Sequence, residues 1–180
     1  ADVPASSVAA PVTIVDLEGK PLQDMIPIAA TRPNAFEEPV ASGPPTDEHG
    51  HSEFSIPSDQ PVFVRGWDPD VKFFANNFYE IEPGPAAQTE AMTLVMVPGA
   101  SLAATIVSAD GTVKEGVPVE IMMAHPSMGP WWPDRGVTGP GGAVHFSSLP
   151  AGQYVVRVVA EDGSSAVLDE VALAPGGHVD

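Results

Sequence analysis

The chain has 180 residues, and 24 acidic residues against 7 basic ones give it a formal net charge of −17 at pH 7. This charge excludes nucleic acid and anionic membranes as expected partners, because both are bound through surfaces rich in Lys and Arg. The chain has no cysteine, which excludes disulfides, thiolate metal sites and a Cys nucleophile. No apolar run approaches the roughly 20 residues of a membrane helix, so we expect no membrane insertion.

The N-terminal residues Ala1, Asp2, Val3 and Pro4 lack an initiator Met. Such a start is typical of a mature N-terminus after removal of a signal peptide. We therefore expect an exported bacterial protein, secreted, periplasmic or at the cell surface. Residues 1–10 are expected to form a loose tail.

The apolar segments that follow are short, partly alternating and rich in β-branched residues, at 12–15, 61–64, 92–97, 104–107, 117–121 and 154–159. Turn residues separate them. This pattern predicts an all-β chain of the sandwich type. The segments 16–20 and 108–112 are predicted hairpin turns with Gly where a positive φ is needed.

Two copies of one pattern lie 92 residues apart. At this single offset Ile14 aligns with Ile106, Gly50 with Gly142, and Phe54 with Phe146. A one-residue slip then aligns Pro57 with Pro150 and Val62 with Val155. A constant offset over several anchor positions indicates a duplicated unit.

The duplication predicts two tandem domains, 11–98 and 99–180. Their junction at 97–101 has almost no linker, which favours a fixed end-to-end pair. Two stretches fit no regular strand, 31–45 and 125–135, and they lie at equivalent points of the repeat. Variable insertions on a repeated scaffold are expected places for binding.

The second copy, VTGPGGAVHFSSLPAGQYVVRVVAEDG, and the shorter TDEHGHSEFSIP of the first resemble the carboxypeptidase regulatory-like domain. The first copy departs from that pattern at Asp59, Gln60 and Pro61, where the family has a G-x-Y step. The resemblance covers almost the whole chain except the tail and the two insertions. It implies a transthyretin-type Greek-key β-sandwich for each domain. Such modules serve as accessory and binding units in unrelated exported proteins, so the resemblance specifies the fold and leaves the function open.

Catalysis is not expected. The isopeptide bond of pilin-type relatives needs an acid where this chain has Arg157, and an Asn in a last strand that has none. The chain also lacks G-x-S-x-G and H-E-x-x-H. An enzyme built between the two units is the weakest of the open alternatives.

Three tryptophans are the first candidates for ligand contacts. Trp131 and Trp132 are adjacent in a loop rich in Pro and Gly, and Trp67 precedes an acidic turn. Adjacent tryptophans are hard to bury together, so one is expected to present a flat apolar surface to a sugar ring or a protein partner. Packing of both against the protein itself is the alternative.

Metal binding is the principal alternative to ligand binding through the tryptophans. The segment 122–128 contains Met123, His125 and Met128, whose thioether and imidazole groups suit copper. His49 and His51 flank a turn glycine beside Asp47 and Glu48, a set that suits zinc or copper. The acidic turn at 67–70 offers oxygen ligands for calcium. Ordinary packing and solvated turns explain the same residues without metal.

The sequence thus predicts two tandem β-sandwiches that form an exported, non-enzymatic binding or spacer module. The expected partner is a polysaccharide or a cell-envelope protein. The alternative is a periplasmic copper-binding protein that uses the Met and His groups of 122–128. The first hypothesis requires no cofactor. The metal-binding alternatives require copper or calcium.

Overall fold

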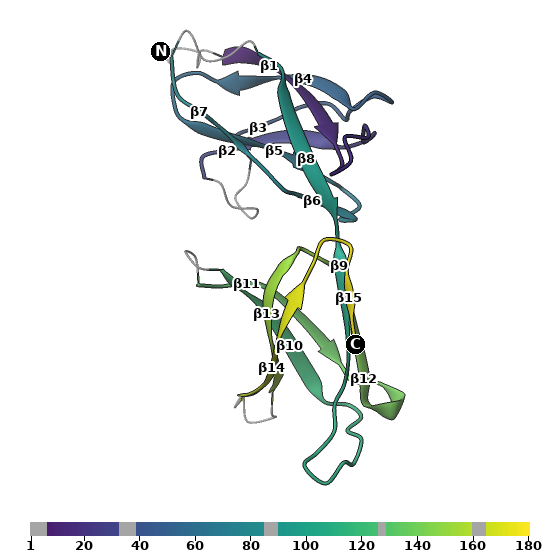
Figure 1. The fold of residues 1–180 in the computed structure, drawn as a ribbon. Helices are drawn as coiled ribbons and strands as arrows, with labels where there is room; N and C mark the ends of the chain where they lie inside the picture. The colour runs from purple at the N-terminus through teal and green to yellow at the C-terminus, as the bar shows by residue number, and fades with distance from the viewer. Residues whose placement is uncertain (1–6, 33–38, 85–89, 126–128, 160–164) are drawn as a thin grey trace. The chain divides into compact units, whose positions relative to one another are not determined.

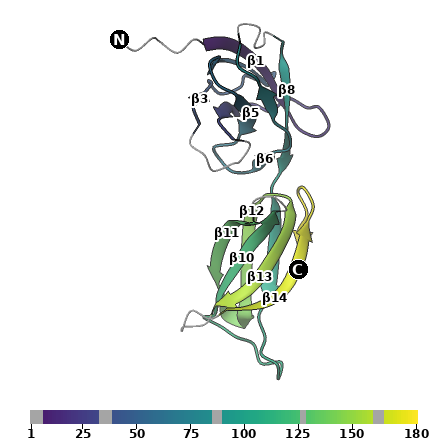
Figure 2. The same ribbon diagram turned by 90° about the vertical axis from the view of Figure 1, so that its left-hand side faces the viewer.

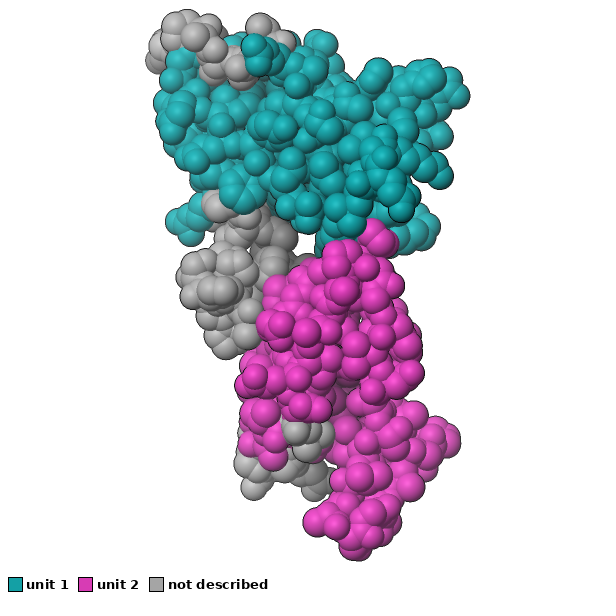
Figure 3. Space-filling view, viewed as in Figure 1, with its two compact units in different colours: residues 1–97 teal, residues 98–180 magenta. Residues whose placement is uncertain are grey.

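A computed structural model describes residues 7–32, 39–84, 90–125, 129–159 and 165–180, with the backbone alone at 124, 125, 129–133 and 168. The chain divides into two compact units, residues 1–97 and 98–180 (Figure 3). The described residues are strands and turns apart from a single 3-10 turn, η1 (Pro140–Gly142). None of them belongs to a helix long and apolar enough to cross a membrane.

Unit 1 consists of two four-stranded sheets, with the orders β4-β1-β8-β6 and β3-β2-β5-β7 (Figure 1). β1 pairs antiparallel with β4 and parallel with β8, whereas β5 pairs antiparallel with both β2 and β7. The strands are β1 (Ser7–Val15), β2 (Ile26–Ala30), β3 (Ala41–Ser42), β4 (His51–Pro57), β5 (Val62–Trp67), β6 (Phe73–Ala75), β7 (Tyr79–Ile81) and β8 (Met92–Pro98).

The core of unit 1 follows from the period-two alternation of its strands. Ile14 and Leu94 from one sheet, and Val62 and Val64 from the other, are fully buried in one apolar cluster. Because successive side chains of a strand point to opposite faces, Phe63, Arg65 and Trp67 lie on the outer face of β5. This outer face carries the candidate site described below.

Unit 2 also consists of two sheets, with the orders β11-β10-β13-β14 and β12-β9-β15. The four strands of the larger sheet lie side by side in Figure 2. Its core includes Ile121, Leu149 and Tyr154, all fully buried. The strands are β9 (Ala100–Thr105), β10 (Pro118–His125), β11 (Gly129–Val137), β12 (Ala143–Leu149), β13 (Gly152–Val159), β14 (Ser165–Leu173) and β15 (His178–Val179).

The prediction of an all-β chain built from β-sandwiches is confirmed, and the duplication is visible in the strand orders. In unit 1 the first strand, β1, lies between the antiparallel β4 and the parallel β8. In unit 2 the first strand, β9, lies between the antiparallel β12 and the parallel β15. In the other sheet of unit 1, β2 lies between the edge strand β3 and β5, and in the other sheet of unit 2, β10 lies between the edge strand β11 and β13.

Buried hydrogen bonds repeat at the same offset. The hydroxyl of Thr46 donates to the carbonyl of Leu22 at 2.6 Å and accepts from the amide of Met25 at 3.0 Å. Thr138 repeats both bonds, to Lys114 at 2.7 Å and from Val117 at 2.9 Å. The repeat therefore preserves the interior polar contacts as well as the apolar pattern.

The predicted one-residue slip is half right. Pairing places Leu149 opposite Ala100 after a register shift beyond Phe146, and Ser148 has a φ of 56°. This β-bulge inserts the extra residue, so Pro57 and Pro150 do correspond.

The match of Val62 with Val155 is wrong. β2 pairs Ile28 with Arg65, and β10 pairs Glu120 with Arg157. Glu120 lies 92 residues after Ile28, and Arg157 lies 92 residues after Arg65, so the 92-residue offset still holds in this strand. Val62 therefore corresponds to Tyr154, and both are fully buried. Pro150 and Tyr154 are one residue closer in sequence than the equivalent Pro57 and Val62, and this difference cancels the bulge. Without that compensation every side chain of β13 would point to the opposite face.

Two further predictions need correction. Residues 7–10 belong to β1 instead of a loose tail, because they pair with β4 and Ala10 is buried. Residues 129–135 are not an irregular insertion, because β11 pairs with β10 from His125–Gly129 to Pro118–Val137. β11 is an edge strand, where the missing amides of Pro130 and Pro133 are tolerated.

Candidate functional site

The site is a pocket on the outer face of the β3-β2-β5-β7 sheet. It has a volume of about 260 Å³ and is lined mainly by Ile26, Ile28, Pro39, Ser42, Arg65 and Trp67. The Trp67 indole is 45 % exposed, whereas Arg65 is only 8 % exposed. The pocket therefore combines an exposed aromatic wall with a sunken guanidinium.

Strand geometry sets these two side chains next to each other. Arg65 and Trp67 are two residues apart on β5, so they share one face of the sheet. Across the ladder they oppose Ile28 and Ile26 of β2, which supply the apolar floor. Burial lowers the pKa of the Arg65 guanidinium, but a guanidinium stays charged at any physiological pH.

More aromatic side chains lie on the same sheet. The rings of Phe63 and Phe78 are 5.6 Å apart at an interplanar angle of 72°, an edge-to-face pair. Phe78 is half exposed, and Phe63 shares the outer face of β5 with Trp67. Unit 1 thus presents Phe78 as well as Trp67 to solvent.

Unit 2 has a groove at the equivalent place, with a different chemistry. Its volume is about 240 Å³, and its lining includes Pro118, Glu120, Arg135 and Val159. The Glu120 carboxylate lies 2.6 Å from Arg135 Nε and 2.5 Å from an Arg157 terminal nitrogen. Arg157 Nε also donates to the same carboxylate at 2.7 Å. Glu120 is 6 % exposed, so this cluster is a partly buried ionic network.

Sequence reasoning selected Trp67 and missed Arg65 and Glu120. A signal was present: an arginine interrupts an apolar run at equivalent positions of the two copies, residues 65 and 157. What the sequence does not show is that the opposing residue is an acid in one copy and an aliphatic side chain in the other. That fact depends on the strand register.

The structure places the remaining candidates as follows. Trp131 lies in β11 opposite Met123, and Trp132 follows it, whereas His125 ends β10 opposite Gly129. The side chains of these three lie outside the described residues, as does the whole of Met128. Met123 itself is a core residue, and its thioether packs in the apolar cluster of unit 2. The copper site therefore stays a prediction.

His49 and His51 do come near each other. Their ring centroids are 6.2 Å apart. The Asp47 carboxylate accepts hydrogen bonds from the backbone amides of both, at 2.9 and 2.8 Å, and these bonds, that of His51 first, lower its pKa. Asp47 therefore caps the turn. Over the part of the chain that the structure describes, no group of three or more His, Asp or Glu side chains is close enough to hold a metal ion.

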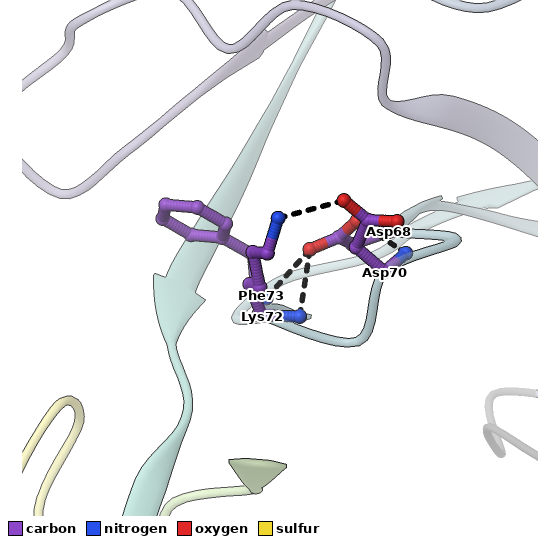
Figure 4. A network of polar contacts seen from close by, with 4 residues as sticks. All are labelled: Asp68, Asp70, Lys72 and Phe73. Atoms are coloured by element: carbon purple, nitrogen blue, oxygen red, sulfur yellow. Dashed lines mark hydrogen bonds and ion pairs between the residues drawn. The ribbon is translucent and has the colours of Figure 1, made fainter.

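The acidic turn proposed for calcium is held together by its own backbone (Figure 4). The buried Asp68 carboxylate accepts from the amides of Asp70, Lys72 and Phe73 at 2.8–2.9 Å. Lys72 Nζ donates to Asp70 at 2.7 Å. Val71 has a φ of 56°, a strained value for a β-branched residue that this network enforces. The carboxylate oxygens of Asp68 and Asp70 thus stabilise this turn.

A hydrogen-bonded row that the sequence did not suggest lies on the β12-β9-β15 sheet. Ser101 Oγ is 2.8 Å from His178 Nδ1, and His178 Nε2 is 2.9 Å from Asp180. The His145 ring lies 6.3 Å from that of His178. Ser101 and His178 are 77 residues apart in sequence, so only the parallel pairing of β15 with β9 unites them. The row is solvent-exposed.

Comparisons with known proteins concern the fold. No protein-family model matches the chain, and no curated protein does. Among solved structures, the TIE protein of Bacillus anthracis matches with a TM-score of 0.39 and 18 % identity, over 96 % of this chain and 33 % of that one. A streptococcal ancillary pilin matches with a TM-score of 0.47 and 11 % identity, over 97 % of this chain and 63 % of that one. GBS52, a minor pilin of Streptococcus agalactiae, matches with a TM-score of 0.46 and 13 % identity, over 94 % of this chain and 92 % of that one.

This chain thus spans a third of the TIE protein and less than two thirds of the ancillary pilin. At such identities a likeness extends to the fold alone, and the β-sandwich itself is evident from the sheets of this chain. The narrower carboxypeptidase regulatory-like assignment stays a prediction.

Proposed function

We propose that this protein is an exported, non-enzymatic binding module that uses the outer face of the β3-β2-β5-β7 sheet to hold a polysaccharide or a cell-envelope protein. One observation carries the proposal: the half-exposed Trp67 indole borders a pocket of about 260 Å³. Partly exposed tryptophans beside a pocket are enriched at sites that dominate binding energy.

The chemistry of the pocket supports binding over catalysis. Among the described residues that line the pocket, the ionisable one is Arg65, and a guanidinium does not exchange a proton near neutral pH. A general acid or base would need a group that titrates near the working pH. The pocket therefore offers aliphatic and aromatic surface, which serves recognition.

The sheet provides a rigid platform for this surface. Val62 and Val64 anchor β5 in the core, while Phe63 and Trp67 alternate with them on the outside. A contact residue on a central strand is held more firmly than one on a loop. Aromatic side chains also lose little conformational entropy when they bind.

The test uses the whole chain and two purified fractions of a bacterial envelope, one of deproteinised polysaccharide and one of solubilised protein. Binding is measured as depletion of the protein from solution. Trp67→Ala is expected to lose about 30-fold in affinity, equivalent to about 2 kcal/mol. The matched control is Leu17→Ala, which removes another exposed apolar side chain of unit 1 and is expected to bind like the wild type.

Wild-type protein that binds neither fraction would leave only a spacer role. Trp67→Ala protein that binds as well as the wild type would exclude this face. Either outcome overturns the proposal.

A further inference from the structure

The hydrogen-bonded row of Ser101, His178 and Asp180 belongs to unit 2 and shares no residue with the pocket of unit 1. Ser101 Oγ lies 2.8 Å from His178 Nδ1, and His178 Nε2 lies 2.9 Å from an Asp180 carboxylate oxygen. A hydroxyl beside an imidazole that a carboxylate orients is the arrangement that activates serine nucleophiles in proteins. The row therefore contains a nucleophile, a base and a group that positions the base.

The hydrogen bonds of the row determine the tautomer of His178. An ionised carboxylate only accepts hydrogen bonds, so His178 Nε2 carries the hydrogen in its contact with Asp180. In the neutral imidazole Nδ1 then has a lone pair, which accepts the hydrogen bond of the Ser101 hydroxyl. The Ser101 proton thus points at the group that would remove it, which is the geometry that general base catalysis needs.

The backbone holds the serine and the imidazole together. Ser101 pairs with His178 in the parallel ladder of β9 and β15, and its amide donates to the Gly177 carbonyl at 2.9 Å. The two reacting groups are therefore positioned before any reagent arrives, so their orientation costs little further entropy. Ser101 is only partly buried, and His178 and Asp180 are exposed, so a small molecule in solution can reach the hydroxyl.

We propose that Ser101 is a nucleophilic serine that takes an acyl group from an activated ester. Its Oγ forms a bond to the carbonyl carbon of the ester while its proton passes to His178 Nδ1. The bond from that carbon to the leaving oxygen then breaks, and the leaving oxygen takes the electron pair and the proton from His178. The products are an acyl-serine and a free alcohol. One acylation per chain needs no turnover, so this reactivity goes beyond the proposed binding function and does not depend on it.

Exposure of the row determines which acyl donors react. An exposed site lacks the water-excluded environment in which enzymes stabilise the oxyanion of the intermediate. An aryl ester or a thioester compensates for this, because its leaving group departs easily. We therefore expect reaction with activated esters and none with amides.

The experiment treats the whole chain with p-nitrophenyl acetate and locates the acetyl groups by peptide mass spectrometry at acidic pH. The internal control is Ser108, a partly buried serine like Ser101, whose hydroxyl donates to the Asp110 carboxylate at 2.6 Å instead of to an imidazole. Ser101 is expected to be acetylated at least tenfold faster than Ser108. Equal rates at the two serines of the wild-type protein would overturn the inference, and this comparison needs no variant.

Variants separate activation from simple exposure. His178→Gln keeps a polar side chain opposite Ser101 but removes the base, so it is expected to lower the Ser101 rate at least tenfold. The matched control His145→Gln removes the neighbouring exposed imidazole, whose ring lies 6.3 Å from that of His178, and is expected to leave the rate unchanged. Acetylation of Ser101 that persists in the His178→Gln protein would contradict the inference.

Asp180 acts through His178, so its positioning role has a separate readout. Nitrogen NMR of the His178 ring distinguishes the two neutral tautomers, and we expect the hydrogen on Nε2 in the wild type. Asp180→Ala is expected to weaken this preference and to lower the Ser101 rate severalfold. A wild-type ring with its hydrogen on Nδ1 would overturn the inference, because Nδ1 could not then accept the Ser101 proton.

Discussion

The two units share one scaffold and differ in what lies on its outer face. The buried threonines, Thr46 and Thr138, make the same pairs of hydrogen bonds, and the strand orders correspond. Outside the core, unit 2 lines its groove with the Glu120 network, whereas unit 1 has a pocket walled by Trp67. The lesson is that duplication preserved the interior contacts, where each change is costly, and let the exposed face diverge.

The largest expected effect comes from the glycines that the two units share. A Cβ on Gly50 would lie 2.5 Å from the Ile14 carbonyl oxygen, and a Cβ on Gly142 would lie 2.8 Å from that of Ile106. Both residues also have positive φ, at 74° and 69°. Either Gly→Ala change is expected to lower the free energy of unfolding of its unit by about 4 kcal/mol, from strain and overpacking together.

The matched control uses the hairpin pair Gly19 and Gly111, which have similar φ values and no atom within 4 Å of an added Cβ. Their Ala variants should cost only about 1 kcal/mol. Hydrogen exchange of amides within each unit measures the effects separately. Equal costs for Gly50→Ala and Gly19→Ala would contradict the close approach to the carbonyl.

The second-largest expected effect is a loss of stability on disrupting the Glu120 network of unit 2. Glu120→Ala leaves Arg157 without its carboxylate on a partly buried face, and is expected to cost about 3 kcal/mol. Arg135→Ala removes only the exposed partner and should cost less than about 1 kcal/mol. Chemical denaturation of the two variants compares them. A cost for Glu120→Ala no larger than that for Arg135→Ala would show that the network adds little stability.

The threonine pair tests whether the units are energetically alike. Thr46→Val and Thr138→Val each remove a hydroxyl that donates one hydrogen bond and accepts another, so each should cost about 2 kcal/mol. Thr93→Val, at an exposed position of β8, should change stability by less than about 0.5 kcal/mol. Costs that differ by more than about twofold between positions 46 and 138 would break the equivalence.

A smaller effect of opposite sign is expected at Asp24. Its φ is 63°, and the equivalent residue of unit 2 is Gly116, with a φ of 74°. Their amides donate to the carbonyls of Thr46 and Thr138 respectively. Asp24→Gly is expected to stabilise unit 1 by about 0.5 kcal/mol, and Gly116→Asp to destabilise unit 2 by a similar amount, because Gly adopts this conformation without strain. Thermal unfolding detects both, and destabilisation by Asp24→Gly would be the contrary result.

The smallest effect is the pH dependence that Asp110 gives to the stability of unit 2. A hydrogen bond from the Ser108 hydroxyl, with help from Thr112, lowers the pKa of Asp110 to about 2. A depressed carboxyl pKa gives stability that is present above the unfolded-state value of about 4 and is lost as the pH falls through about 2. Asp110→Asn should remove this slope. The difference in unfolding midpoint between wild type and variant, measured from pH 4 to pH 2, tests it, and a constant difference would contradict it.

Much of the fold could be predicted because it depends on local patterns. The β-branched runs, the turn glycines and the 92-residue offset predicted strands and duplication without reference to tertiary contacts. The failures lie where pairing overrides composition. Residues 129–135 look like a loop rich in Pro and Gly, yet β10 pairs with residues 129–131 and 134–135. Residues 7–10 were predicted to belong to a loose tail, yet they pair with β4 and Ala10 is buried.

The sequence by itself determined the all-β character, the repeat and the presence of Trp67 beside an acidic turn. Only the tertiary structure decided that Val62 corresponds to Tyr154, because a bulge at Ser148 and a shorter loop compensate each other. Only the register decided that Arg65 faces Ile28 while Arg157 faces Glu120. The physical reason is that a strand has a period of two, so one residue of register decides which side chains meet, and register depends on the partner strand.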